Sequence, residues 1–397
     1  MMSKFKYLLF FILFISFTIS NAQDFFLDAN GVTIKCPAAA VGDTGIVGGD
    51  TYVKVDRASL VASITAGANV QFCCTSGITD MSYLINDATF DRNIGGWDTS
   101  SVTTMEGMFE GANNFNQDIG EWDTSNVNNT ARMFYNAQNF DQDISSWNME
   151  KVTTFLKMFR DALEFNQPIG TWTVSSVTSF DELFYNARKF NQDLDGWDTS
   201  KVGNFTNVFR DAVAFNGDIT TWDTSSATTM REMFKGARDF NRDIGSWNVS
   251  QVINMYEMFF GARNFNQDIS DWDTSSVTSM YQMFINAIAY DNGGVALDWD
   301  DGFGVGANLS KMFFLNKKFN QDVSDWDTSN VVNLTQMFER SAFNNGGSDL
   351  DWDDGFGLNA NLFKMFRESP FNQKVSSWDT SNVLTMRLMF DRAYFFN

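Results

Sequence analysis

Apolar side chains recur at a fixed period from about residue 78 to the C-terminal end of the chain. All 12 tryptophans, from Trp97 to Trp378, lie in one register, separated by 25 residues seven times and then by 27, 27, 26 and 26 residues. Counted from Trp as position 1, the 25-residue units carry apolar residues at positions 6, 9, 12, 13, 16, 19 and 23. This period indicates stacked repeats, because a single unit is too small to bury its own apolar side chains.

Positions 9, 12, 13 and 16 predict a two-turn amphipathic helix in each unit. In the unit of Trp97 they are Met105, Met108, Phe109 and Ala112, spaced as one face of a helix. Position 8 carries a side chain that can accept a hydrogen bond from a free N–H at a helix start, at Thr104, Asn129, Thr154, Ser179, Asn204, Thr229, Asn254, Ser279, Asn333 and Thr385, and at Asn308 and Asn361 in two longer units. The residue three places later resembles a capping box at Glu182, Glu232, Glu257, Gln282 and Gln336.

The rest of the unit predicts extended chain. Val102, at position 6 in a Ser/Thr-rich stretch, favours a short strand, and Phe115 and Ile119 favour an extended return. A two-turn helix is not stable alone in water, so the coils are expected to hold together through ladders of stacked Trp, Met and Phe. The predicted fold class is therefore an α/β repeat, a solenoid of about twelve coils that each combine a short strand with a two-turn helix.

The N-terminal end predicts export. Residues 1–22 read as a signal peptide, with Lys4 and Lys6 before an apolar run and the small residues Ser20 and Ala22 at a cleavage site. The apolar run is shorter than the roughly 20 residues needed to span a membrane, and no later run is long enough either. We therefore expect a secreted or cell-surface protein with no membrane-spanning segment in the mature chain.

Two further regions follow. Residues 23–77 contain no Trp and predict a small N-terminal cap region with strands at Gly31–Lys35 and Thr51–Asp56 and a helix at Ala58–Ala66. Residues 78–397 form the repeat solenoid, whose last coil is cut short after Phe396. That truncation predicts that the sequence is a fragment of a longer protein.

Two recurring polar positions predict structural hydrogen bonds. Asp at position 2, followed by Thr-Ser, favours an Asx turn, at Asp98, Asp123, Asp198, Asp223, Asp273, Asp327 and Asp379. Asn at position 20 is expected to bond the backbone of adjacent coils as a ladder, at Asn116, Asn166, Asn191, Asn216, Asn241, Asn266, Asn320 and Asn372.

The repeat W-D-T-S-x-V-x-x-M-x-x-M-F-x-x-A-x-x-F-N-Q-D-I resembles that of the BspA-like leucine-rich-repeat surface proteins, also described as a domain of unknown function first noted in mycoplasmas. Gly31–Pro37 and Cys74–Ser82 are similar to the amino-terminal block of the Bacteroidetes type. The resemblance implies a right-handed, leucine-rich-repeat-like solenoid on the cell surface or secreted, used for adhesion or protein contact. It supplies no catalytic residue. The sorting or anchoring region frequent in such proteins is missing here, which leaves the mode of attachment open.

Composition narrows the function. The net charge is −21, and removal of residues 1–22, which hold two lysines and no acid, makes it −23, a field that repels nucleic acid. The chain has no His, which removes the usual general bases and most transition-metal sites, so we expect neither catalytic residues nor an enzyme. The three cysteines are Cys36, Cys73 and Cys74; Cys36 can pair with either of the others.

Two unusual units suggest a weak calcium site. Leu-Asp-Trp-Asp-Asp-Gly-Phe-Gly occurs twice, each time after an Asn/Gly-rich loop, and its carboxylates could supply hard oxygen ligands. The candidate ligands are Asp298, Asp300, Asp301, Asp351, Asp353 and Asp354. The spacing is not that of an EF-hand, and solvated loop acids are the favoured explanation of the pattern; no other cofactor is expected.

The sequence therefore favours a non-enzymatic binding or adhesion protein that presents its variable positions 5, 7, 10 and 11 to an extracellular protein or glycan. A structural surface-layer or spacer protein without a specific ligand is the alternative. A carboxylate-based glycan hydrolase is a remote third.

Overall fold

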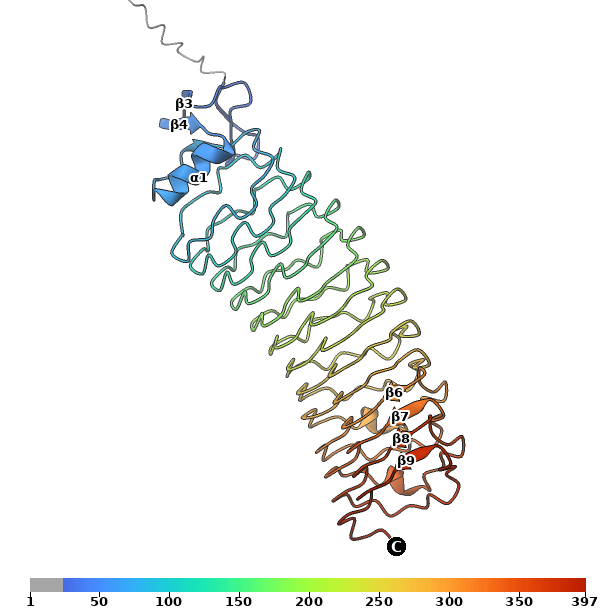
Figure 1. The fold of residues 1–397 in the computed structure, drawn as a ribbon. Coiled ribbons are helices and arrows are strands. Elements are labelled where there is room, and N and C mark those ends of the chain that lie inside the picture. Colours follow the sequence, from blue (N-terminus) through green and yellow to red (C-terminus); the bar gives the residue numbers. More distant parts are fainter. Residues whose placement is uncertain (1–23) are drawn as a thin grey trace, which may run out of the picture.

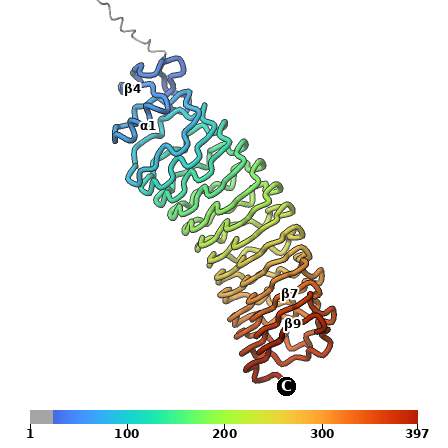
Figure 2. The backbone as a smooth tube through the Cα atoms, in the orientation of Figure 1, coloured from blue at the N-terminus to red at the C-terminus, as the bar shows by residue number. Residues whose placement is uncertain are grey.

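The computed structural model describes residues 24–397, so the predicted signal peptide at residues 1–22 lies outside the described residues. An N-terminal region with small sheets and one helix leads into a long stack of coils, one for each repeat (Figures 1 and 2). One continuous hydrophobic cluster runs through the stack from Val55 to Met389. The helix is nine residues long, and no helix of the described part could cross a membrane.

Regular secondary structure is sparse. The N-terminal region holds β1 (Phe26–Leu27), β2 (Ile34–Lys35), β3 (Thr44–Val47), β4 (Asp50–Lys54), α1 (Arg57–Thr65) and β5 (Cys73–Cys74). The repeats hold two 3-10 turns, η1 (Asn292–Gly294) and η2 (Asn345–Gly347), and the strands β6 (Ala307–Asn308), β7 (Val331–Asn333), β8 (Ala360–Asn361) and β9 (Val383–Thr385). β1 pairs with β2 and β3 with β4 antiparallel, β5 joins β4 in parallel, and β6 to β9 form one parallel sheet.

The predicted right-handed, leucine-rich-repeat-like solenoid of about twelve strand-plus-helix coils is wrong. The only α-helix among residues 24–397 is α1, which lies before the repeats. Where a two-turn helix was expected, at Met105–Ala112 and the equivalent residues of later units, the backbone is a run of turns. Most coils contribute only a one-residue parallel bridge at position 8, such as Thr104 to Asn129, rather than a strand at Val102.

Hydrogen bonding explains why no helix forms. Along positions 11 to 16, N–H groups alternate between a carbonyl of the next coil and a carbonyl three residues back. Met108 N–H donates to Met105 O at 3.1 Å, whereas Phe109 N–H donates to Met133 O, 24 residues on, at 2.9 Å. These turns point positions 12 and 13 inward at the spacing of a helix face, so the apolar pattern fits both structures.

Positions 11 and 15 take left-handed backbone, which an α-helix excludes. In the second repeat φ is +58° at Arg132 and +57° at Asn136. The predicted capping-box residues lie at position 11, and Glu182, with a φ of +55°, is typical of them. Position 8 accepts a hydrogen bond as expected, but within a turn: Asn129 Oδ1 accepts from Ala131 N–H at 3.0 Å.

The predicted aromatic ladders are confirmed. The rings of Trp197 and Trp222 lie 6.3 Å apart with their planes 4° from parallel, and Trp222 stacks on Trp247 in the same way. Within a coil, the Phe residues at positions 13 and 19 stack closely, at 3.7 Å for Phe209 and Phe215. Most indole N–H groups donate to a carbonyl about one coil away; Trp222 donates to Leu194 O, 28 residues earlier, at 3.0 Å. Trp247 is an exception among the described residues, because its indole N–H has no partner.

The predicted Asn ladder and the predicted Asx turns are also confirmed. From Asp91 to Asn344, the side-chain oxygen at position 20 accepts the backbone N–H of position 20 in the next coil, as Asn216 does from Asn241 at 2.9 Å. Asp198 Oδ1 accepts from Ser200 N–H at 3.1 Å, which closes an Asx turn. The buried Thr199 between them donates its hydroxyl to Asp223 O of the next coil at 2.9 Å. The motif W-D-T-S therefore serves coil stacking.

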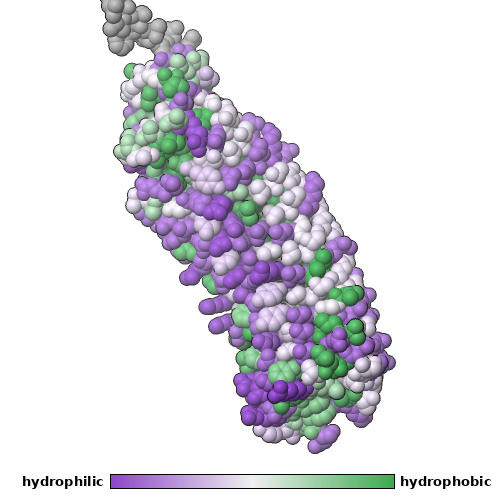
Figure 3. Space-filling view, viewed as in Figure 1, coloured by the Kyte–Doolittle hydropathy of each residue, from purple (hydrophilic) through white to green (hydrophobic). Residues whose placement is uncertain are grey.

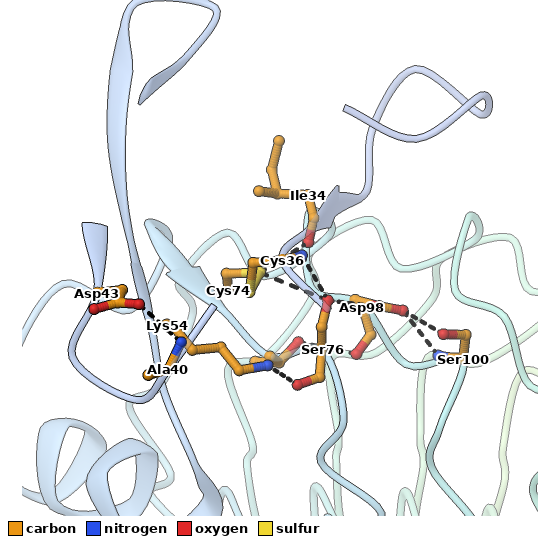
Figure 4. Close-up of a disulfide and its surroundings, with 10 residues drawn as sticks. Ile34, Cys36, Ala40, Asp43, Lys54, Cys74, Ser76, Asp98 and Ser100 are labelled. Carbon is orange, nitrogen blue, oxygen red and sulfur yellow. Dashed lines mark hydrogen bonds between the residues drawn. A yellow bond between two sulfur atoms is a disulfide. The ribbon is translucent and has the colours of Figure 1, made fainter. Parts of the chain in front are cut away.

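A disulfide lies within the N-terminal region, and a buried polar cluster beside it connects this region to Asp98 of the repeats (Figure 4). Cys36 bonds to Cys74, and Cys73 stays a buried free thiol. Ser76 Oγ accepts from Cys36 N–H at 2.9 Å and donates to Asp98 Oδ2 at 2.5 Å. The ammonium of Lys54 donates to the Ser76 carbonyl, and burial lowers the pKa of Lys54.

We expect Trp222→Ala to lower the free energy of unfolding by about 3–5 kcal/mol, because it opens a cavity between two stacked rings. Urea denaturation followed by fluorescence measures the change. Lys201→Ala, at an exposed position of the preceding coil, is the control and should stay within about 0.5 kcal/mol of the parent protein. Equal free energies of unfolding for the two variants would contradict a stabilising role of the Trp stack.

Asn216→Ala should cost about 1 kcal/mol, because the N–H of Asn241 loses its acceptor. Asn216→Asp should cost less, since the ladder already uses aspartate at this position, where Asp141 Oδ1 accepts from Asn166 N–H at 2.9 Å. Thermal denaturation of both variants separates the two cases. The same loss in both would show that the oxygen acceptor is not what matters.

Candidate functional site

The two longer units that carry the candidate calcium ligands are shaped by buried asparagines. η1 and η2 lie in the loops that precede the two acidic motifs. Asn292, fully buried, accepts from Ile269 N–H at 3.0 Å and donates to Ala296 O at 2.8 Å. Asn345 repeats these bonds with Val323 and Asp349. The loops before the two acidic units are therefore held in the same conformation.

These units and the coil between them form an open hollow of about 620 Å³, which we call the aspartate groove. It is lined by Asp298, Asp300, Ser324, Asp325, Trp326, Asp349, Asp351, Asp353 and Asp354. Five of the six candidate ligands line it, and Asp301 does not. Asp325 and Asp349 were missed, because they lie outside the duplicated motif and join it only through stacking.

Negative charge dominates this groove. Burial, followed by the neighbouring carboxylates of Asp300 and Asp325, raises the pKa of Asp298. Asp349 in its lining forms an ion pair with Lys374 at 3.1 Å, and both side chains are largely exposed. Among residues 24–397, no three carboxylates converge closely enough to hold one metal ion.

The glycines of the two acidic units have a structural explanation. Gly302 has a φ of +75°, and a Cβ there would lie 3.0 Å from Asp327 Cβ of the next coil. Gly355 is placed in the same way against Asp379. Left-handed backbone and close coil approach both require glycine, so its recurrence does not by itself point to an ion-binding loop.

A second groove, which we call the arginine groove, was not predicted. It consists of two adjoining hollows of about 550 and 600 Å³ that share Asp211, Val213 and Arg238. It crosses six consecutive repeats and is lined by Arg160, Asp161, Tyr185, Asn186, Arg188, Asp211, Val213, Lys235, Gly236, Arg238, Phe260, Gly261, Arg263, Asn286 and Ile288. The signal in the sequence was a set of basic residues at positions 14 and 17 of an acidic chain.

One edge of this groove is held by ion pairs between coils. Position 14 of one coil pairs with position 11 of the next, as Arg160 does with Glu182 and Arg210 with the nearly fully buried Glu232. The ring of Tyr185 lies between the same two arginines, 4.3 Å from Arg160 and 5.2 Å from Arg210. Alternating charges and rings therefore fix the side chains along this edge.

The other cations of the groove are less engaged. Arg188 Nε donates to the Asn186 amide oxygen at 2.9 Å and pairs with no carboxylate of the described chain. The exposed guanidinium groups of Arg238 and Arg263 have no hydrogen bond or ion pair within residues 24–397. Each groove therefore offers charged and hydrogen-bonding groups along several coils, and the charges of the two grooves are opposite in sign. The face shown in Figure 3 is largely hydrophilic.

Comparison with family models supports the resemblance of the repeats. A family described as "Mycoplasma protein of unknown function, DUF285" matches residues 58–159, 121–222, 207–302 and 304–355, well over half of the chain. The comparisons with curated proteins and with solved structures find no match.

The raised pKa of Asp298 predicts a pH-dependent stability. The folded protein holds this proton more tightly than the unfolded chain does, so ionisation of Asp298 costs stability. The cost is absent below the unfolded carboxyl pKa of about 4, grows as the pH rises through the raised folded value, and is complete at neutral pH. Asp298→Asn should therefore raise the free energy of unfolding at neutral pH and lose this advantage near pH 3.

Asp198→Asn is the control for this comparison, measured by urea denaturation at both pH values. The hydrogen bond from the Ser200 hydroxyl, followed by that from its backbone N–H, lowers the pKa of Asp198, so removal of its charge should bring no gain at neutral pH. A gain in both variants would mean that general charge reduction, rather than the aspartate groove, is responsible.

Proposed function

We propose that this chain, which belongs to the DUF285 family of mycoplasma-type repeat proteins of unknown function, is a non-enzymatic binding or adhesion protein. In this proposal the stacked coils are a scaffold, and an extracellular protein or glycan lies across several of them. Many weak contacts over a long surface then add up to useful affinity.

The arginine groove is the observation that carries the proposal. It runs over six repeats whose inward residues hardly differ, while its lining changes from Arg to Val to Ile at position 17. Packing restricts which side chains can occupy the core, whereas varied exposed side chains on a rigid frame are typical of recognition. A groove of two open hollows suits an elongated partner better than a small molecule, which usually binds in an enclosed apolar pocket.

We place this activity outside the cell, in a BspA-like protein of the Bacteroidetes type. The pattern of residues 1–22 is that of a signal peptide. The Cys36–Cys74 disulfide agrees with an oxidising compartment. The lack of histidine in the sequence favours binding over acid–base catalysis.

The proposal predicts saturable binding of the purified full chain to one class among immobilised extracellular matrix proteins and polysaccharides. Bio-layer interferometry at physiological salt measures it. As a control for folding, Trp222→Ala should lose binding together with melting cooperativity, whereas Lys201→Ala should keep both.

Two results would count against this function. Absence of binding across the array, together with self-association of the full chain in analytical ultracentrifugation, would favour a structural surface-layer or spacer role. Release of reducing sugar from a bound polysaccharide would favour a glycan hydrolase.

A further inference from the structure

We propose that the arginine groove binds an acidic polysaccharide, laid along the stack so that its negative groups meet Arg188, Arg238 and Arg263 in turn. This inference rests on the proposed binding function and specifies its ligand. It assigns the contact to position 17 of the repeats, which differs from the exposed positions 5, 7, 10 and 11 expected from the sequence.

The first support is the contrast in pairing within one groove. Its two acids are already engaged: Asp161 contacts Arg160 at 3.3 Å and accepts from the Asn186 amide at 2.7 Å, and Asp211 faces Arg210 at 3.6 Å. The three position-17 arginines have no such carboxylate. The groove therefore carries uncompensated positive charge on a chain whose net charge is −21.

The second support is the arrangement of the unpaired donors. Arg238 and Arg263 occupy the same position in consecutive repeats, and Arg188 lies two repeats before Arg238. The backbone N–H groups of Arg238 and Arg263 also find no acceptor among residues 24–397. Donors that stand at one position of the repeat, one or two coils apart, match a polymer that repeats its acidic group along its length.

The groove lining favours a polysaccharide over an acidic peptide. An extended peptide usually adds a strand to a free sheet edge, but the carbonyls of Val213 and Arg238 already accept from Asp239 and Asn264 of the next coils, at 3.2 and 3.1 Å. A helical peptide needs a continuous apolar strip, whereas the apolar residues here, Val213, Phe260 and Ile288, are separated by charged ones. The side-chain amides of Asn186 and Asn286, which also line the groove, instead suit the hydroxyl groups of a sugar chain.

The test compares dextran sulfate with uncharged dextran, which has the same backbone, and with poly-L-glutamate, on the full chain. The groove variant is Arg238→Gln with Arg263→Gln. The matched control is Lys201→Gln with Arg387→Gln, which removes the same charge at two exposed residues outside the groove. All proteins are first compared by thermal melting, where no difference is expected.

We expect saturable binding of dextran sulfate that weakens with salt, no binding of dextran, and roughly tenfold weaker binding by the groove variant with less than about twofold change in the control. Equal weakening by both variants would overturn the proposal, as would poly-L-glutamate binding as tightly with the same arginine dependence.

Two further outcomes separate the ligand from the function. No affinity for dextran sulfate, with saturable binding of a matrix protein elsewhere in the array, overturns the polysaccharide and leaves the binding function standing. No affinity for any probe overturns both.

Discussion

The fold depends on the hydrogen bonds that each coil makes with its neighbours. In positions 9 to 16, every second backbone N–H leaves its own coil and donates to the next, as Phe109 does to Met133. A coil removed from the stack would lose these partners and expose its Trp and Phe side chains at the same time. Because backbone pairing fixes the offset between coils, like side chains come into register, and the stacked rings, the Asn ladder and the Thr hydroxyl bonds follow from it.

The same constraint leaves the outer positions free. Once the inward residues and the ladder positions satisfy packing and hydrogen bonding, neighbouring coils can present different side chains without disturbing the frame. The arginine groove uses this freedom at positions 14 and 17. The aspartate groove arises differently, from two loops at η1 and η2 that bring two copies of one acidic motif together across an intervening coil. One frame thus carries two regions of opposite charge.

Features that depend on one recurring residue could be predicted from the sequence. The backbone conformation of the coils and the surfaces formed across several coils could not. The Trp ladder, the Asx turns and the Asn ladder were predictable, because each depends on a residue type that recurs at one position. The helix was wrong, although a contrary signal was present: position 15 is Gly, Asn or Asp from Gly111 to Asn286, the residues that best tolerate left-handed backbone. The arginine groove was missed because the sequence does not show the offset between coils. That offset decides whether Arg188 and Arg263 lie on the same surface.

Because the coils are nearly identical, the length of the stack can change by one whole repeat at a time. A duplication or loss of one 25-residue unit, the kind of event that recombination between similar stretches of coding sequence produces, would preserve the backbone pairing and ring stacking between the coils. Inside residues 160–288 it would lengthen or shorten the recognition surface by one step. Binding strength could then be tuned by copy number alone, without a single substitution in the interior.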